Sequence, residues 1–141
     1  MSLPRSFALL VFLVFALSAA AQDVVTVGTV TANGSIVDVP VYIRDVSGTP
    51  LGIDQPAGSR IQSFSIKVNY SPVSAVSAVS FSRAGITANL TPVSEFTPAT
   101  SGAISLLDTF HESTTLIPFT SNAAPPGNQV AHLVFTLSGS A

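Results

Sequence analysis

Cysteine and tryptophan are both absent from this chain of 141 residues, and only 9% of its side chains are charged. Without cysteine there can be no disulfide framework, and a lipid anchor on a cysteine behind a signal peptide is also excluded. The formal net charge is −2, so the chain has no basic patch and we expect no nucleic acid partner. Hydrophobic residues make up 47% of the chain, which suffices for the core of a single domain.

The first 21 residues have the layout of a secretory signal peptide. Arg5 precedes an apolar run over residues 7–17, and small residues continue to Ala21. The run is too short to span about 30 Å of hydrocarbon as a helix. We therefore expect cleavage after Ala21, with Ala20 as the alternative, rather than retention as a membrane anchor. The mature domain, residues 22–141, is then expected to be secreted or held at the cell surface, without stable membrane insertion.

The stretch IQSFSIKVNYSP, residues 61–72, alternates in polarity. Phe64, Ile66 and Val68 form an apolar set, while the residues between them are polar. A period of two over this length predicts a strand with one buried face. The polar face is either solvated or used for recognition, and its residues are Ser63, Ser65, Lys67 and Asn69.

Other segments are also rich in β-forming residues and are separated by Gly, Pro, Asn and Ser. We expect strands over residues 24–30, 35–46, 103–110 and 129–139, a short turn and strand through Phe81, and a further strand over 113–121. Pro40 cannot donate to a ladder, which predicts an edge strand or a bulge there. With no amphipathic helix, the fold class is all-β, an antiparallel β-sandwich.

The facing of these strands predicts the core. The residues expected in it are Val27, Val37, Val39, Val41, Ile43, Phe64, Ile66, Val68, Tyr70, Phe81, Leu106, Leu133, Phe135 and Leu137.

Catalytic and metal-binding patterns are weak. The chain has no G-x-S-x-G, H-E-x-x-H or P-loop motif. Asp108, His111 and Glu112 lie close in sequence, and Asp38, Asp45 and Asp54 could meet around a cation. However, polar groups at a strand end are usually solvated, and the aspartate spacing matches no calcium loop. We therefore expect no enzyme activity, no cofactor and no metal.

Several pieces, taken in order, resemble the cohesin family. These are the opening VGTV (residues 27–30), the VDVPV of residues 37–41, the Tyr70-Ser71-Pro72 that ends the third strand, and Gly127 followed by residues 130–137. The resemblance covers nearly the whole mature chain. It implies a jelly-roll sandwich related to carbohydrate-binding modules. It also implies a role outside the cell as a partner of dockerin modules in polysaccharide-degrading assemblies.

The same resemblance places an Asn and an Asp that contact dockerin at the positions of Ser63 and Ser65, so both contacts are changed here. Ser63, Ser65, Lys67 and Asn69 nevertheless provide a polar contact surface. Tyr42 is the one plausible platform for a sugar ring, because the chain has only two tyrosines and no tryptophan. Sugar binding through it is expected to be weak.

Cohesins continue past the last strand seen here with another strand that pairs with the first. The present sequence stops at LSGSA, so we expect the closing strand to be missing and the chain to be part of a longer reading frame, with a shorter natural variant as the alternative. The expected function is a secreted, non-catalytic binding module for a dockerin-like protein module or an extracellular polysaccharide. The alternative is a structural or adhesive spacer domain at the cell surface.

Overall fold

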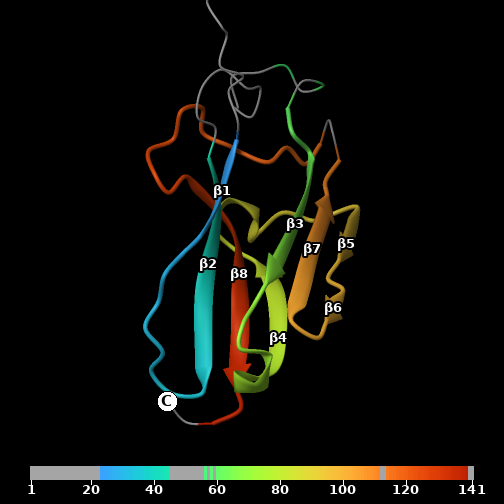
Figure 1. The fold of residues 1–141 in the computed structure, drawn as a ribbon. Helices are drawn as coiled ribbons and strands as arrows, with labels where there is room; N and C mark the ends of the chain where they lie inside the picture. The colour runs from blue at the N-terminus through green and yellow to red at the C-terminus, as the bar shows by residue number, and fades with distance from the viewer. Residues whose placement is uncertain (1–22, 45–55, 57, 59, 112–113, 140–141) are drawn as a thin grey trace, which may run out of the picture.

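Two antiparallel β-sheets form the fold (Figure 1). The computed structural model describes residues 23–44, 56, 58, 60–111 and 114–139. The expected signal peptide, Asp45, Asp54, Glu112 and most of the loop before β3 lie outside the described residues. The all-β prediction is confirmed.

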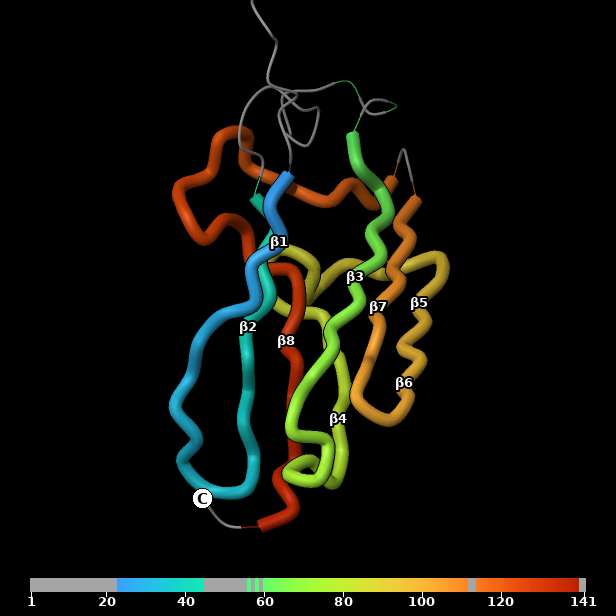
Figure 2. The backbone as a smooth tube through the Cα atoms, in the orientation of Figure 1, coloured from blue at the N-terminus to red at the C-terminus, as the bar shows by residue number. Residues whose placement is uncertain are grey.

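Sheet A contains the first, second, fourth and last strands. Its order is β1 (Val24–Val27), β2 (Ile36–Arg44), β8 (Asn128–Leu137) and β4 (Val76–Arg83). The chain reaches β8 only at the end, yet this strand lies between β2 and β4 (Figure 2).

Sheet B is smaller. Its order is β3 (Ser63–Asn69), β7 (Ala103–Thr109) and β5 (Ser94–Phe96), with β6 (Ala99–Thr100) also paired to β7. Two 3-10 turns, η2 (Val73–Ala75) and η3 (Gly85–Thr87), are the helical elements of the described residues. Among those residues no helix has the length and apolar character needed to cross a membrane.

The core lies between the sheets and follows the predicted period of two. In β2, Val39, Val41 and Ile43 are buried, and β8 adds Ala131 and Leu133 from the same face. Sheet B contributes the inward side chains of β3 and β7, among them Ile66, Ile104 and Leu106. Alternating side chains on facing strands therefore make one continuous apolar layer.

Pro40 is not on an edge strand, because β2 pairs with β1 on one side and with β8 on the other. The alternative prediction, a bulge, is supported next to it: the β2–β8 register shifts between Val41 and Tyr42. The missing N–H of Pro40 is tolerated beside this irregularity, and its carbonyl still accepts a hydrogen bond from Gly28 N–H at 2.8 Å.

The strand expected over residues 113–121 is wrong for the part that is described, because residues 114–121 form no strand. Ile117 and Phe119 are nevertheless almost fully buried. Pro118 between them has no N–H for a ladder, and the Phe119 N–H bonds to the Ile117 carbonyl at 2.9 Å instead. This segment thus fills the core without joining a sheet.

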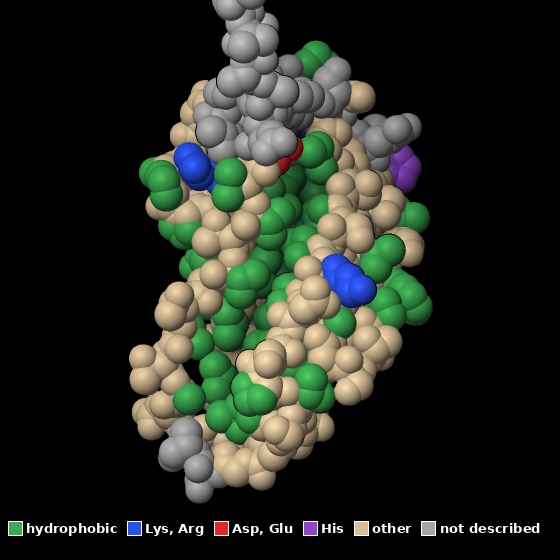
Figure 3. Space-filling view, in the orientation of Figure 1, with side chains coloured by type: hydrophobic (Ala, Val, Ile, Leu, Met, Phe, Trp, Pro, Cys, Tyr) green, Lys and Arg blue, Asp and Glu red, His purple; other side chains and the backbone are tan. Residues whose placement is uncertain are grey.

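Val27 was expected in the core but is 44% exposed, and Val25 on the same face of β1 is 50% exposed. Both pair with inward residues of β2, Val41 and Ile43, so they lie on the inner side of sheet A. They are exposed because sheet B has no described strand opposite β1. A stripe of hydrophobic side chains is accordingly visible between β1–β2 and β3 (Figure 3).

Candidate functional site

The outer face of β3 carries the polar side chains selected from the sequence. Ser63, Ser65, Lys67 and Asn69 are all exposed, and they alternate with side chains that point into the sandwich. The strand runs straight through these four positions in unbroken register with β7. The structure therefore brings the four predicted residues together on one surface.

Two large apolar side chains extend this surface across the neighbouring strands. Leu107 of β7 pairs with Ser65 on one side and with Phe96 of β5 on the other. Leu107 is 39% exposed and Phe96 is 62% exposed. We call the surface formed by Ser63, Ser65, Lys67, Asn69, Leu107 and Phe96 the sheet B face.

Phe96 and Leu107 were missed in the sequence. Leu107 occupies the outward set of its strand, so alternation with Leu106 could have identified it. Phe96 lies in a region rich in Thr, Pro and Ser that showed no clear period. Its position depends on the pairing of β5 with β7, which local sequence does not specify.

Tyr42 does not join this surface. It belongs to β2 in sheet A, where it pairs with Thr26 and Gln129. Its side chain is only half-exposed, and the outer faces of the two sheets point in opposite directions. Tyr42 is therefore not part of one site with the four β3 residues.

A cluster of charged side chains connects the two sheets at their β4 and β5 edges. Arg83 Nε donates to Glu95 Oε2 at 2.6 Å. Glu95 pairs in register with Asp108 of β7. The guanidinium of Arg83 also donates through Nη1 to the Thr87 carbonyl at 3.2 Å and to the Leu90 carbonyl. One arginine thus joins β4, the following crossover and β5.

Asp108 was interpreted as part of a solvated strand end, and this is wrong. Its side chain is 1% exposed, because Asp108 occupies the same inward set of β7 as Ile104 and Leu106. His111 from the same sequence group is exposed, while Glu112 lies outside the described residues. The structure thus buries Asp108 and leaves His111 exposed.

Neither side-chain oxygen of Asp108 has a hydrogen-bond donor in the described structure. Burial, together with the negative charge of Glu95, raises the pKa of Asp108 from 3.8 to about 6, and Arg83 partly opposes this rise. Two ionised carboxylates only accept hydrogen bonds. A proton on Asp108 allows it to donate to Glu95, which favours the protonated form.

A second pair of ionisable groups lies on the outer face of sheet A. His132 Nδ1 contacts Asp38 Oδ1, and His132 Nε2 lies 3.3 Å from Gln129 Nε2. The side chains of His132 and Asp38 are 36% and 54% exposed. His132 was predicted to point outward, and it does. Its partner Asp38 could not be identified from a single strand.

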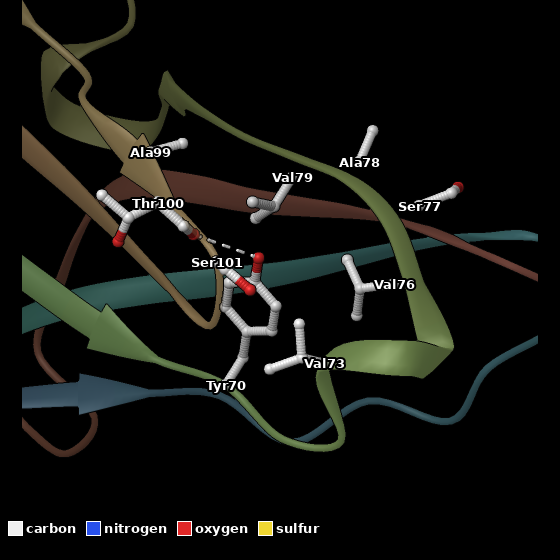
Figure 4. A pocket seen from close by; sticks show the side chains of 9 residues that line it. All are labelled: Tyr70, Val73, Val76, Ser77, Ala78, Val79, Ala99, Thr100 and Ser101. Carbon is white, nitrogen blue, oxygen red and sulfur yellow. Dashed lines mark hydrogen bonds between the residues drawn. The ribbon is translucent and has the colours of Figure 1, made fainter.

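A cavity of about 430 Å³ opens where β3 ends, lined by Tyr70, Val73, Val76, Ser77, Ala78, Val79, Ala99, Thr100 and Ser101. The Tyr70 ring lies in its middle with the hydroxyl 3.5 Å from the Thr100 carbonyl (Figure 4). The ring also packs edge-on against Phe135, at 5.5 Å between centroids. The lining has no charged side chain.

In the described part of the chain, no three His, Asp or Glu side chains gather as metal ligands would. No protein-family model matches the chain, and no match was found among curated proteins or solved structures.

Proposed function

We propose that this chain is a non-catalytic binding module that acts outside the cell and contacts a partner protein through the sheet B face. The proposal depends on one observation: the neighbouring side chains of Phe96 and Leu107 are exposed beside a row of polar residues. Exposed apolar side chains with a polar border are typical of protein interfaces. The partner class, a dockerin-like module, comes from the resemblance to cohesins.

A protein partner is favoured over a polysaccharide. Sugar rings stack on aromatic faces, and the single aromatic side chain of the sheet B face is Phe96, with aliphatic Leu107 beside it. Tyr42, the platform expected from the sequence, is half-exposed on the other sheet. Apolar contact with a partner helix or loop makes better use of these two side chains.

The test is to measure binding of calcium-loaded dockerin modules to the mature chain by biolayer interferometry. The double variant F96S/L107S should weaken binding at least tenfold, because hot spots lie in apolar centres with polar borders. The matched control is I36S, since Ile36 is 64% exposed on sheet A. Equal losses in both variants would contradict the proposal.

Other outcomes decide between the alternatives. Binding to xylan or a soluble β-glucan that is lost in F96S/L107S would replace the protein partner with a polysaccharide. No binding to either class would favour a structural or adhesive spacer domain.

The jelly-roll topology belongs to the same proposal. It is supported by the strand orders, which place β8 between β2 and β4 in sheet A and β7 between β3 and β5 in sheet B. The exposure of Val25 and Val27 on the inner side of sheet A is tested with the variant V25T/V27T by urea unfolding. A loss of more than about 2 kcal/mol would mean that both side chains are already buried.

A further inference from the structure

Strand β5 is the least supported part of the sheet B face. It has three residues, and β7 is its partner in the described sheet. Ser94 and Phe96 lie on the outer side, so Glu95 is the one side chain that β5 directs toward Asp108 and the other sheet. Contacts to the Glu95 side chain therefore add to the backbone pairing with β7 in holding Phe96 in place.

Two contacts hold Glu95. The first is the bond from Arg83, which also binds the carbonyls of the crossover between β4 and β5. The second is the neighbouring carboxyl of Asp108. On the opposite side, the β3 residue paired with Asp108 is Phe64, which is uncharged. Among the described residues, the charges that act on Asp108 are thus those of Glu95 and Arg83.

The two carboxyl groups can bond to each other only through a shared proton. Without that proton, Asp108 is a buried anion without a donor, next to a second anion. Moving β5 away from β7 would let water reach Asp108. We propose that Asp108 and Glu95 form a proton-binding pair that fastens β5 to β7 when protonated and loosens β5 when the proton leaves.

This pair lies directly beneath the contact between Phe96 and Leu107, since Glu95 precedes Phe96 and Asp108 follows Leu107. If the sheet B face is a docking surface, which rests on the proposed function, mildly acidic conditions strengthen docking by ordering Phe96. The proton-binding pair itself does not depend on any partner.

The experiment measures the full mature chain without a partner. Carbon-13 NMR of the carboxyl groups gives the titration of Asp108, and amide hydrogen exchange gives protection factors for residues 93–96. We expect Asp108 to titrate near pH 6. Protection of β5 should fall on the order of 50-fold from pH 4 to pH 7.5, because the open form binds the proton less tightly. Protection in β8 should stay constant.

The variant D108N should abolish the pH dependence of β5 protection, and D38N is the matched control with an exposed aspartate. E95Q gives a second test should D108N fail to fold, since it lowers the titration midpoint of Asp108. Titration of Asp108 near pH 4, or equal loss of protection in β5 and β8, would overturn the proposal. Both readouts are taken on the chain without a partner, so a failure here and a failure of docking are separate results.

Discussion

Two aspartates, Asp108 and Asp38, show how differently one carboxyl group can be placed in a sandwich. Asp108 is 1% exposed on the inner side of sheet B and has no donor. Asp38 is 54% exposed on the outer side of sheet A and contacts His132. Water and the His132 ring can stabilise the second carboxylate, whereas burial disfavours the charge of the first.

Because of this difference, the two side-chain pairs near these aspartates should contribute unequally to the free energy of unfolding. The bond between Arg83 and Glu95 joins separate sheets and lies over a buried carboxyl group. The contact between Asp38 and His132 lies within one sheet and faces solvent. Solvent screening makes such an exposed pair worth little.

Among these variants, D108N is expected to change the free energy of unfolding the most. The pKa of Asp108 is raised to about 6 in the folded state, so the folded chain holds this proton more tightly than the unfolded chain does. The contribution of Asp108 to stability is therefore favourable below about pH 4, falls as the pH rises toward 6, and stays low above it. At pH 7, D108N should be more stable than wild type by about 2–3 kcal/mol.

Urea unfolding of both proteins at pH 4 and pH 7 measures this effect. At pH 4 the difference should be less than about 1 kcal/mol, since both proteins are then neutral at position 108. A difference of the same size at both pH values would show that burial does not disfavour the charge of Asp108.

R83Q is expected to lower the free energy of unfolding, by less than D108N raises it. It removes the cation beside Glu95 and the donor to the Thr87 and Leu90 carbonyls. The expected loss is about 2 kcal/mol at pH 7, typical of a charged hydrogen bond, and the pKa of Asp108 should rise further because Arg83 lowers it. K67Q, which changes an exposed cation, should alter urea unfolding by less than about 0.5 kcal/mol.

The smallest effect is expected for D38N. Loss of its exposed contact with His132 should change the free energy of unfolding by no more than about 0.5 kcal/mol. A loss above about 1.5 kcal/mol in urea unfolding would mean that this exposed pair carries as much weight as the buried cluster, and the contrast between the two aspartates would not hold.

Alternation made the main strands predictable. In β2, β3 and β8 the apolar side chains recur at every second position, so both the strands and their facing follow from local sequence. The polar row from Ser63 to Asn69 was identified for the same reason. The joint surface with Phe96 was not, because the pairing of β5 with β7 connects segments that carry no common pattern.

Asp108 shows a different limit. Leu106 and Phe110, two positions before and after Asp108, are both buried. The period of two therefore predicts that the Asp108 side chain points inward. It was assigned to solvent because carboxyl groups are rarely buried. The partners that make its burial tolerable, Glu95 and Arg83, come from strands whose pairing was unknown.

The central position of β8 has a consequence for the order of synthesis. This strand is the last of the described elements to leave the ribosome, yet both β2 and β4 pair with it. Sheet A therefore cannot be completed until nearly all of the described chain has been made, and contacts between such distant segments form slowly. The apolar faces of β2 and β4 should therefore stay exposed for most of translation, and such exposed surfaces are the ones that chaperones bind.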